Sequence, residues 1–402
     1  MIRLKKSLAV ILSSFVVILG MGCNNGGNNP SETYDIALIS EFGGTEEDLL
    51  IPQLREYLNE NDFDAQCRFL IDNERMDYYF TRILLKWNGT IGHDFDVYLA
   101  DNSEFTNATV IATQYTTLAP SFLIPGTIYF WKVIDNTTGE KSKTDTFKVK
   151  DAPVRIIVLN GADNVRDCGG WRTESGKNVK YGMIYRGGRI NGTGNVTNLS
   201  EDSKNIFENV LKVKTEIDLR TPDADDGGQT ANCVNSLLGY VKAPLSQYTY
   251  IFPQFNQVTP VVRKYDERTK SSLKSIFETL SDETNYPIYY HCNAGADRTG
   301  TLAFLINGLL GVSYEDLTRD FEITSFTEKK SIRWRGSREN FIDGVMQDDS
   351  DNYVAWGQMY EYMMRNYGEN KNLSEAIENY LVSQCDIEQA TLDKVKTILL
   401  EH

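Results

Sequence analysis

Short segments of alternating hydrophobic and polar residues dominate the chain between residues 78 and 149. Aromatic and β-branched residues alternate with polar ones in "DFDVYLA", "TIYFWKVID" and "DTFKVK", and Asn-Gly, Pro-Gly and Thr-Gly turn signals separate such segments. A period of two residues is typical of strands with one buried face. The pattern predicts a small antiparallel β-sandwich, or else a β-extension of the domain that follows. Before it, residues 46–59 form a weaker helical pattern that Pro52 is expected to interrupt.

Beyond residue 153 the pattern changes to alternating strands and helices. The strand-like runs "VKTEIDLR" and "YPIYYHC" are apolar without strict alternation, which is typical of a parallel sheet covered on both faces. Helix-like runs such as "SSLKSIFETL" and "TGTLAFLINGLLG" lie beside them, and helical segments continue to the end of the chain. We therefore expect an α/β domain, a parallel-type sheet flanked by helices, over residues 153–402. Its boundary with the sandwich region falls in "KVKDAPVR".

The N-terminus has the pattern of an export signal. Basic residues precede an apolar run over residues 8–19, and small residues and Cys23 follow it. The run is short for a membrane span, so residues 1–22 are predicted to be a signal peptide. The Gly-Cys junction resembles a bacterial lipobox, which implies lipidation of Cys23, although Gly20 stands where leucine is usual. The polar residues 23–34 then form a tether. We expect an exported protein anchored by lipid to a bacterial membrane, facing the periplasm or the cell surface, with simple secretion as the alternative.

Composition narrows the function. The chain has 41 Lys and Arg against 56 Asp and Glu, a net charge of −15, so nucleic acid is not an expected partner. The 3 histidines are too few for a histidine-rich metal centre. Apart from Cys23, five of the 6 cysteines remain. An odd number leaves at least one thiol unpaired or paired between chains, and Cys292 is the expected free one.

The stretch "YYHCNAGADRTG", residues 289–300, joins an apolar strand to a helix. The strand brings Cys292 to the carboxyl edge of the sheet, where open α/β folds bind ligands. The loop that follows can turn its backbone N–H groups inward at the positive end of the helix, which forms an anion site. The same field stabilises the Cys292 thiolate and makes it a nucleophile. The predicted phosphate-binding residues are Asn293, Ala294, Gly295, Ala296, Asp297 and Arg298.

Arg298 gives this loop its second catalytic group. Its planar guanidinium can hold two phosphate oxygens, a geometry that lysine lacks. Gly295 permits the tight backbone path, and the Thr299 hydroxyl can hydrogen-bond the thiolate. His291 is expected to orient the loop rather than carry a proton. The alternative is a buried structural cysteine in a strand-to-helix turn.

The loop "HCNAGADRTG" resembles the signature of cysteine-dependent protein tyrosine and dual-specificity phosphatases. It is most similar to a bacterial group that carries aspartate before the arginine. The segments "NVRDCGGWRTESGKNVKYGMIYRGGRI", "EIDLRTPDADD" and "MMRNYGENKNLSEAIENYL" are also similar to that group, so the resemblance covers residues 155–400. Outside it, "LIPGTIYFWKV" resembles the fibronectin type III pattern, which implies that residues 35–150 are such a sandwich with an N-terminal extension.

The phosphatase resemblance implies hydrolysis of phosphomonoesters through a phosphocysteine on Cys292, without metal or cofactor. It implies a phosphotyrosyl protein or a small phosphomonoester as substrate. Members of the group often have lysine where this chain has Ala296, and the missing charge favours phosphotyrosine over inositol phosphates. Dual-specificity, phosphoinositide or inositol-phosphate activity is the enzymatic alternative. A catalytically silent phosphate-binding surface module is the non-enzymatic one.

The general acid is less evident. The chain contains no Trp-Pro-Asp, and Ser246 and Gln247 stand where the group's acid is expected. Asp297 is therefore the predicted donor, and Asp223 is a weaker candidate. Other polar residues are expected to brace the loop and sheet, and these are Arg166, Asp167, Arg186, Asp218 and Arg220. Tyr248 and Tyr250 either line the mouth of the pocket or pack, and Cys168 and Cys233 are expected to be packed or disulfide-bonded.

Overall fold

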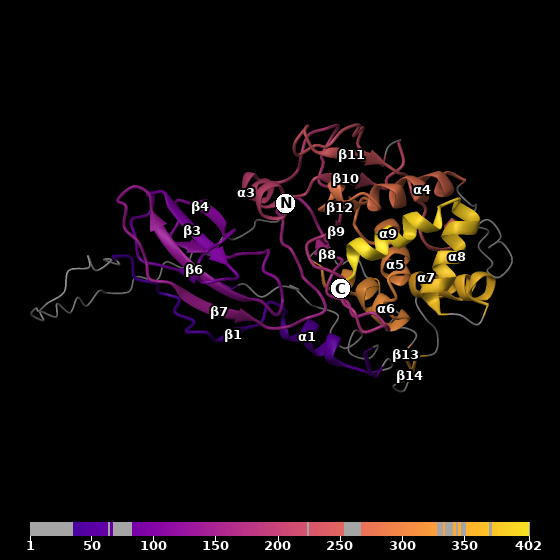
Figure 1. Ribbon diagram of the computed structural model, residues 1–402, viewed down its shortest axis with the longest axis horizontal. Helices are drawn as coiled ribbons and strands as arrows, with labels where there is room; N and C mark the ends of the chain where they lie inside the picture. Colours follow the sequence, from indigo (N-terminus) through magenta and orange to yellow (C-terminus); the bar gives the residue numbers. More distant parts are fainter. Residues whose placement is uncertain are drawn as a thin grey trace, which may run out of the picture.

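The computed structural model describes residues 35–62, 65–66, 83–222, 225–252, 267–327, 333, 341–342, 345–346, 351–369 and 372–401 (Figure 1). The predicted signal peptide, Cys23 with its tether, and Asp223 lie outside these residues. No helix within the described ranges combines the length and the apolar character needed to cross a membrane.

The N-terminal part is built from two sheets. The larger has the order β1-β7-β6-β3-β4, and β1 pairs parallel with β7 while the other neighbours are antiparallel. Its strands are β1 (Glu46–Glu47), β3 (Phe95–Ala100), β4 (Thr109–Thr113), β6 (Ile128–Asp135) and β7 (Asp145–Val149). A short antiparallel pair adds β2 (Leu85–Lys86) and β5 (Thr117–Leu118). Every second residue of β6 is buried, as the alternating pattern predicts.

The second part has a central sheet of order β11-β10-β12-β9-β8. The first four strands are parallel and β8 runs antiparallel to β9, which confirms the predicted parallel-type sheet. In chain order the strands are β8 (Arg166–Asp167), β9 (Ile184–Gly187), β10 (Thr215–Asp218), β11 (Gly239–Lys242) and β12 (Ile288–His291). A small hairpin adds β13 (Phe341–Ile342) and β14 (Val345–Met346).

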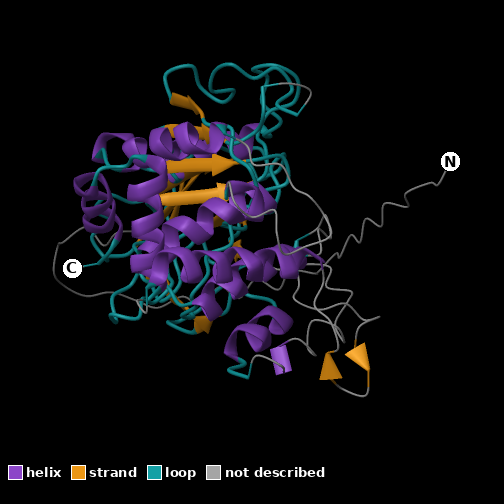
Figure 2. Ribbon diagram, turned by 90° about the vertical axis from the view of Figure 1, so that its right-hand side faces the viewer, coloured by secondary structure: helices purple, strands orange, loops and turns teal. Residues whose placement is uncertain are grey.

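Helices enclose this sheet (Figure 2). They are α3 (Glu201–Asn205), α4 (Arg268–Leu280), α5 (Asp297–Leu309), α6 (Tyr314–Ile323), α7 (Asp351–Met363), α8 (Leu373–Cys385) and α9 (Gln389–Leu399). The π-helical turns η1 (Ile206–Val210) and η6 (Met364–Gly368) extend α3 and α7, and the 3₁₀ turn η4 (Thr324–Phe326) extends α6. Two further 3₁₀ turns are η2 (Tyr248–Ile251) and η3 (Glu283–Asn285).

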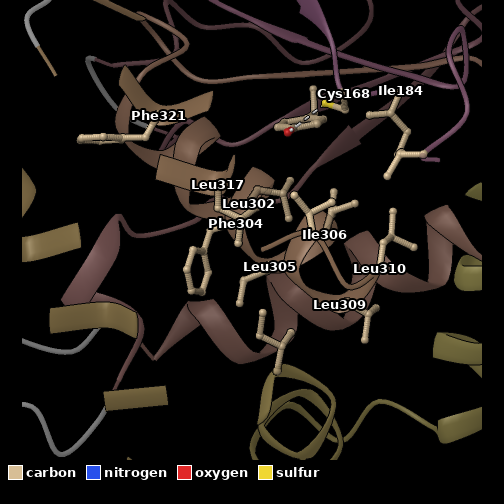
Figure 3. Packing of buried hydrophobic residues seen from close by; sticks show 14 of the residues in the cluster. Cys168, Ile184, Leu302, Phe304, Leu305, Ile306, Leu309, Leu310, Leu317 and Phe321 are labelled. Carbon is tan, nitrogen blue, oxygen red and sulfur yellow. Dashed lines mark hydrogen bonds between the residues drawn. The ribbon is translucent and has the colours of Figure 1, made fainter. Parts of the chain in front are cut away.

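Both faces of the sheet are buried, which explains the unbroken apolar strands. On β12, Ile288 and Tyr290 belong to the core formed with α4, α5, α6, α8 and α9. Figure 3 shows this core around α5, where Leu302 and Ile306 lie among side chains from the sheet and α6. Tyr289 points to the opposite face and packs on Phe207 of η1, with ring centroids 5.4 Å apart.

The opposite face of the sheet shares its core with the N-terminal sandwich. One continuous apolar cluster contains Trp87 and Trp131 of the sandwich together with Val165, Tyr185 and Tyr289 of the α/β part. The predicted boundary at residues 148–155 therefore separates two folding patterns, but the two parts bury apolar surface against each other.

A helix of the N-terminal extension crosses to the α/β part. Pro52 begins α1 (Pro52–Asn59) instead of interrupting it, which corrects the prediction from sequence. The first position of a helix tolerates proline, because its N–H would have no intrahelical partner. Leu54, Tyr57 and Leu58 of α1 are buried in the same core as α5 and α6. In Figure 1, α1 lies between the sandwich and the α/β part.

Candidate functional site

The predicted strand–loop–helix unit is present at the carboxyl edge of the sheet. Strand β12 ends at His291, Cys292 follows it directly, and α5 begins at Asp297. Gly295 has a φ of +69°, a left-handed conformation that glycine adopts without strain. A Cβ at this position would lie 2.6 Å from the backbone nitrogen of Gly188, so only glycine fits. The turn is tight because the loop lies directly on the end of β9.

The loop carbonyls are held from outside. The Gly295 carbonyl accepts hydrogen bonds from Asn164 Nδ2 at 2.9 Å and from Arg186 Nη2 at 3.0 Å. The Asn293 carbonyl accepts from the Arg189 amide at 3.1 Å. Among the described residues, the backbone amides of the loop have no hydrogen-bond acceptor. They are therefore available for an anion at the N-terminus of α5, as the sequence predicts.

Cys292 lies at the base of this loop and is only 3% exposed. Burial alone would raise the pKa of its thiol, but the charge of Arg298 and the hydroxyl and amide of Thr299 outweigh burial and lower that pKa. The Thr299 hydroxyl is itself buried, without a conventional hydrogen-bond partner in the described part of the chain. It is therefore free to donate to the thiolate, the form of cysteine that acts as a nucleophile.

Arg298 forms an ion pair with Asp225 in the loop after β10. Burial opposes charge on this carboxylate, yet the hydrogen bond and charge of Arg298 lower the Asp225 pKa. The side chains of Arg298 and Asp225 are 20% and 26% exposed, so the pair faces solvent at the site. Sequence reasoning missed Asp225 because it lies 73 residues from Arg298. The acidic run "DADD" after Asp-Leu-Arg was the available signal.

Asp297, the acid predicted from sequence, has different partners. Its carboxylate accepts from the Tyr248 hydroxyl at 2.7 Å and from Arg333 Nε and Nη2 at 2.6 and 2.9 Å. Burial would raise the Asp297 pKa, but Arg333 outweighs it and the pKa is lowered. Tyr248 is buried, with its ring packed edge-on against Phe321 and Trp356. It therefore anchors the start of α5.

Buried polar residues brace the loop from behind. Asp320 of α6 forms ion pairs with Arg166 and Arg186, and Arg166 also donates to the side chain of Asn164. The structure thus gives Arg166 and Arg186 the bracing role predicted for them. Asp320 was missed, because nothing in the pattern of α6 distinguishes it from an ordinary helical aspartate.

The remaining predicted braces lie in the sheet. His291 is buried and contacts the Cys292 carbonyl through Nδ1 at 3.0 Å and Glu216 through Nε2 at 2.8 Å, in agreement with an orienting role. Asp218 pairs with Arg220 at 2.8 Å, and Asp167 pairs with Arg155 at 2.9 Å. Neither pair includes a residue of the Cys292 loop.

The four described cysteines are all buried and free, namely Cys168, Cys233, Cys292 and Cys385. Cys292 is therefore unpaired as expected, but it is not distinguished from the other three in this respect. Burial raises the pKa of Cys168, Cys233 and Cys385 to about 12, so Cys292 differs from them in its acidity. Within the described ranges, no three His, Cys, Asp or Glu side chains are grouped so as to hold a metal ion.

Known proteins are similar to the α/β part. Residues 157–401 match the family described as the tyrosine phosphatase family. A tyrosine-protein phosphatase of Nostoc commune is 27% identical over 125 residues, which cover 29% of this chain and 41% of that protein. A putative tyrosine-protein phosphatase of Cupriavidus necator is 23% identical over 178 residues, which cover 41% of this chain and 61% of that protein. The chain thus spans less than two thirds of the length of either relative.

A solved structure also matches. It is the core catalytic domain of the PP-IP phosphatase SIW14 from S. cerevisiae in complex with citrate. The two chains are 16% identical, the match covers 39% of this chain and 80% of that one, and the TM-score is 0.23.

Proposed function

The chain belongs to the tyrosine phosphatase family, and on that premise we propose that it hydrolyses phosphomonoesters through a phosphocysteine on Cys292. One observation carries the proposal. A buried cysteine with a lowered pKa lies in a loop whose amides are unoccupied within the described structure, beside Arg298. That arrangement can bind a phosphoryl group and attack it in the same place.

The reaction has two displacement steps. In the first, Cys292 Sγ forms a bond to phosphorus, the ester P–O bond breaks, and an acid gives its proton to the leaving oxygen. Arg298 and the loop amides hold the non-bridging oxygens, whose charge they stabilise. In the second, water attacks phosphorus, the conjugate base of the acid takes a proton from that water, and the S–P bond breaks. Inorganic phosphate and the thiolate are released, and Thr299 stabilises the thiolate.

We assign the acid to Asp225 in preference to Asp297. Asp297 anchors the start of α5. Both of its carboxylate oxygens already accept hydrogen bonds from Tyr248 or Arg333, which compete with a leaving group for them. Asp225 is held mainly by Arg298. When phosphate takes over that guanidinium, Asp225 loses its stabilising partner, and its pKa rises toward a value at which it can carry a proton.

The proposed substrate is a phosphotyrosyl protein or a small aryl phosphomonoester. The relatives are named as tyrosine-protein phosphatases, and the apolar Ala296 is buried in the loop, where lysine would add a charge for inositol phosphates. Dual-specificity or inositol-phosphate activity is the alternative. A substrate panel separates them: turnover of phosphotyrosyl peptide no faster than that of phosphoseryl peptide and inositol phosphates would overturn the tyrosine assignment.

We further propose that the enzyme acts outside the cytoplasm, attached to a bacterial membrane through lipidated Cys23. In this proposal the sandwich, of fibronectin type III type, holds the catalytic part away from the lipid surface. The basic and apolar N-terminal residues and the polar segment after Cys23 support it. Labelling of the expressed protein with a palmitate analogue, lost in Cys23→Ala, is the direct check.

The decisive experiment compares p-nitrophenyl phosphate hydrolysis by the wild type, Cys292→Ser and Cys385→Ser. The substrate has a good leaving group and needs little acid assistance, so the assay reports the nucleophile. We expect Cys292→Ser to fall to the rate of an enzyme-free blank and Cys385→Ser to retain wild-type activity, since Cys385 is an equally buried, free cysteine in α8. Equal rates for wild type and Cys292→Ser would exclude the mechanism. An inactive wild type that binds phosphate would favour the silent module.

A further inference from the structure

A helix that lies outside the family match contacts a segment next to the residues that hold the Cys292 loop. We propose that Tyr57 of α1 is a positioning residue for the Cys292 loop, so that the N-terminal extension is part of the catalytic apparatus. The inference rests on the proposed function, because it assigns Tyr57 a role in the same reaction. Tyr57 precedes the matched residues 157–401 by a hundred positions.

Tyr57 contacts the α/β part at two residues of one segment. Its side chain is fully buried, and its hydroxyl donates to the Glu322 carboxylate near the end of α6. Its ring packs on Phe326 of η4, with centroids 5.3 Å apart. A buried hydroxyl that donates to a buried carboxylate ties the positions of the two segments to each other, because a hydrogen bond shielded from water is costly to break.

Thr324 lies between these two contacts and reaches toward the loop. Its hydroxyl accepts a hydrogen bond from Asn164 Nδ2 at 3.2 Å. The same amide donates to the Gly295 carbonyl at 2.9 Å. From the segment 322–326 that Tyr57 contacts, one threonine hydroxyl and one asparagine side chain therefore lead to the backbone of the Cys292 loop.

A parallel contact runs through α6 itself. Arg319 Nη2 donates to the Glu60 carbonyl, at the end of α1, at 3.1 Å. Arg319 and Glu322 are three residues apart and share one face of α6, which is the face toward α1. Asp320 lies on a different face and pairs with Arg186, whose Nη2 donates to the Gly295 carbonyl at 3.0 Å. Helix α6 thus joins α1 on one side to the loop on the other.

The function of the loop depends on these outer hydrogen bonds. The Gly295 carbonyl and the Ala296 amide belong to one planar peptide unit and point in opposite directions, so the Ala296 amide can face phosphate only while the Gly295 carbonyl is held on the other side. If η4 shifts, Asn164 follows Thr324 and the loop amides no longer converge. Displacements of about 1 Å at reacting groups can cost on the order of 100-fold in rate. A tyrosine that merely fills the core would affect stability without this effect on the loop.

The test compares Tyr57→Phe with Tyr129→Phe in the full-length chain. Both tyrosines are buried in the N-terminal part. The Tyr129 hydroxyl accepts a local hydrogen bond from the Ile124 amide at 3.0 Å, and within the described ranges it has no hydrogen bond to the α/β part. We expect Tyr57→Phe to lower kcat/KM for p-nitrophenyl phosphate about tenfold. We also expect it to move the pH midpoint of Cys292 alkylation by iodoacetamide upward, because displaced amides stabilise the thiolate less. Tyr129→Phe leaves both quantities unchanged.

The path through η4 is tested with Thr324→Val. Thr324→Val should lower kcat/KM and raise the alkylation midpoint as much as Tyr57→Phe does, and the double variant should be no worse than the more severe single one. The reason is that Tyr57→Phe is proposed to act by releasing the hydrogen bond between Asn164 and Thr324, which Thr324→Val removes directly. Additive losses would overturn the path. If Tyr57→Phe has the same kcat/KM and the same alkylation midpoint as the wild type, the inference is overturned, whatever happens to the melting temperature. If the wild type hydrolyses no phosphomonoester, the proposed function fails, while the alkylation midpoint still decides this inference.

Discussion

At the scale of single residues, the chemistry of Cys292 depends on neighbours that are distant in sequence. Arg298 and Thr299, which favour its thiolate, come from the first turn of α5 directly after the loop and are evident in the motif. Asp225, which binds Arg298, comes from another loop, and Asp297 is held by Arg333 from beyond α6. Asp225 and Asp297 both lie near Arg298, but Asp225 pairs with that arginine while Asp297 pairs with Arg333, so the two carboxylates have different environments. The proposed assignment of the acid rests on this difference.

The acid assignment predicts a dependence on the leaving group. Asp225→Asn should reduce kcat for phenyl phosphate by roughly 10²- to 10⁴-fold, the usual contribution of general acid catalysis. The loss for p-nitrophenyl phosphate should be much smaller, because its good leaving group needs little help from an acid. Steady-state kinetics on both substrates measure the difference.

Asp297→Asn is the matched comparison. It removes a charge that Arg333 and Tyr248 hold, so its loss should be similar for the two substrates. A large, leaving-group-dependent loss in Asp297→Asn, with none in Asp225→Asn, would return the acid role to Asp297.

At the scale of elements, the site is a loop whose shape is set by what it packs on. Strand β12 and helix α5 provide its two ends, and both follow from local pattern. The close approach of Gly295 to Gly187 and Gly188 depends on the pairing of β12 with β9. Three hydrogen bonds to carbonyls of the loop then fix its path, from Asn164 before β8, Arg186 of β9 and the Arg189 amide after β9.

Substitution of Gly295 tests this packing. In Gly295→Ala the left-handed backbone costs roughly 1–2 kcal/mol, and the new Cβ would also lie 2.6 Å from the Gly188 nitrogen. We expect at least a tenfold loss of kcat/KM. Gly139→Ala is the control, since Gly139 has a φ of +82° and nothing within 4 Å of an added Cβ. In Gly139→Ala the strained backbone should lower the melting temperature, while kcat/KM should stay unchanged. Equal kinetic effects of the two variants would show that the contact with β9 is unimportant.

At the scale of the whole molecule, the sandwich and the α/β part share apolar surface. The family match begins at residue 157, yet the sheet face that carries Tyr185 and Tyr289 is buried in one cluster with Trp87 and Trp131. Helix α1 adds Leu54 and Tyr57 to the other core. The core of the α/β part is therefore completed by residues from outside the family region.

Truncation measures this dependence. A chain of residues 153–402 would expose Ile157, Val165 and Tyr185 to water, at a cost of about 25 cal/mol per Å² of apolar surface. We expect it to be insoluble, or to melt more than about 10 °C below the intact protein, since each kcal/mol shifts the melting temperature by about 2–4 °C at this size. A chain that starts at residue 24 is the control and should melt like the intact protein. A soluble monomeric 153–402 with an unchanged melting temperature would contradict the shared core.

The local features of this protein were determined by its sequence alone. The alternating β6, the apolar β12, the Cys-x5-Arg loop and the N-terminus of α5 all follow from residues close together in the chain, because hydrophobic period, turn chemistry and helix ends act over a few residues. Pro52 shows the limit of such patterns, since the same residue can interrupt a helix or begin one.

Tertiary structure alone decided which distant groups meet. Asp225 forms an ion pair with Arg298, and Asp320 forms ion pairs with Arg166 and Arg186. The Tyr57 hydroxyl donates a hydrogen bond to Glu322. These pairings span tens to hundreds of residues and depend on strand order and on which helix faces pack together. No local pattern encodes them, because an aspartate or tyrosine on a helix has the same sequence signature whether it faces solvent or a buried partner.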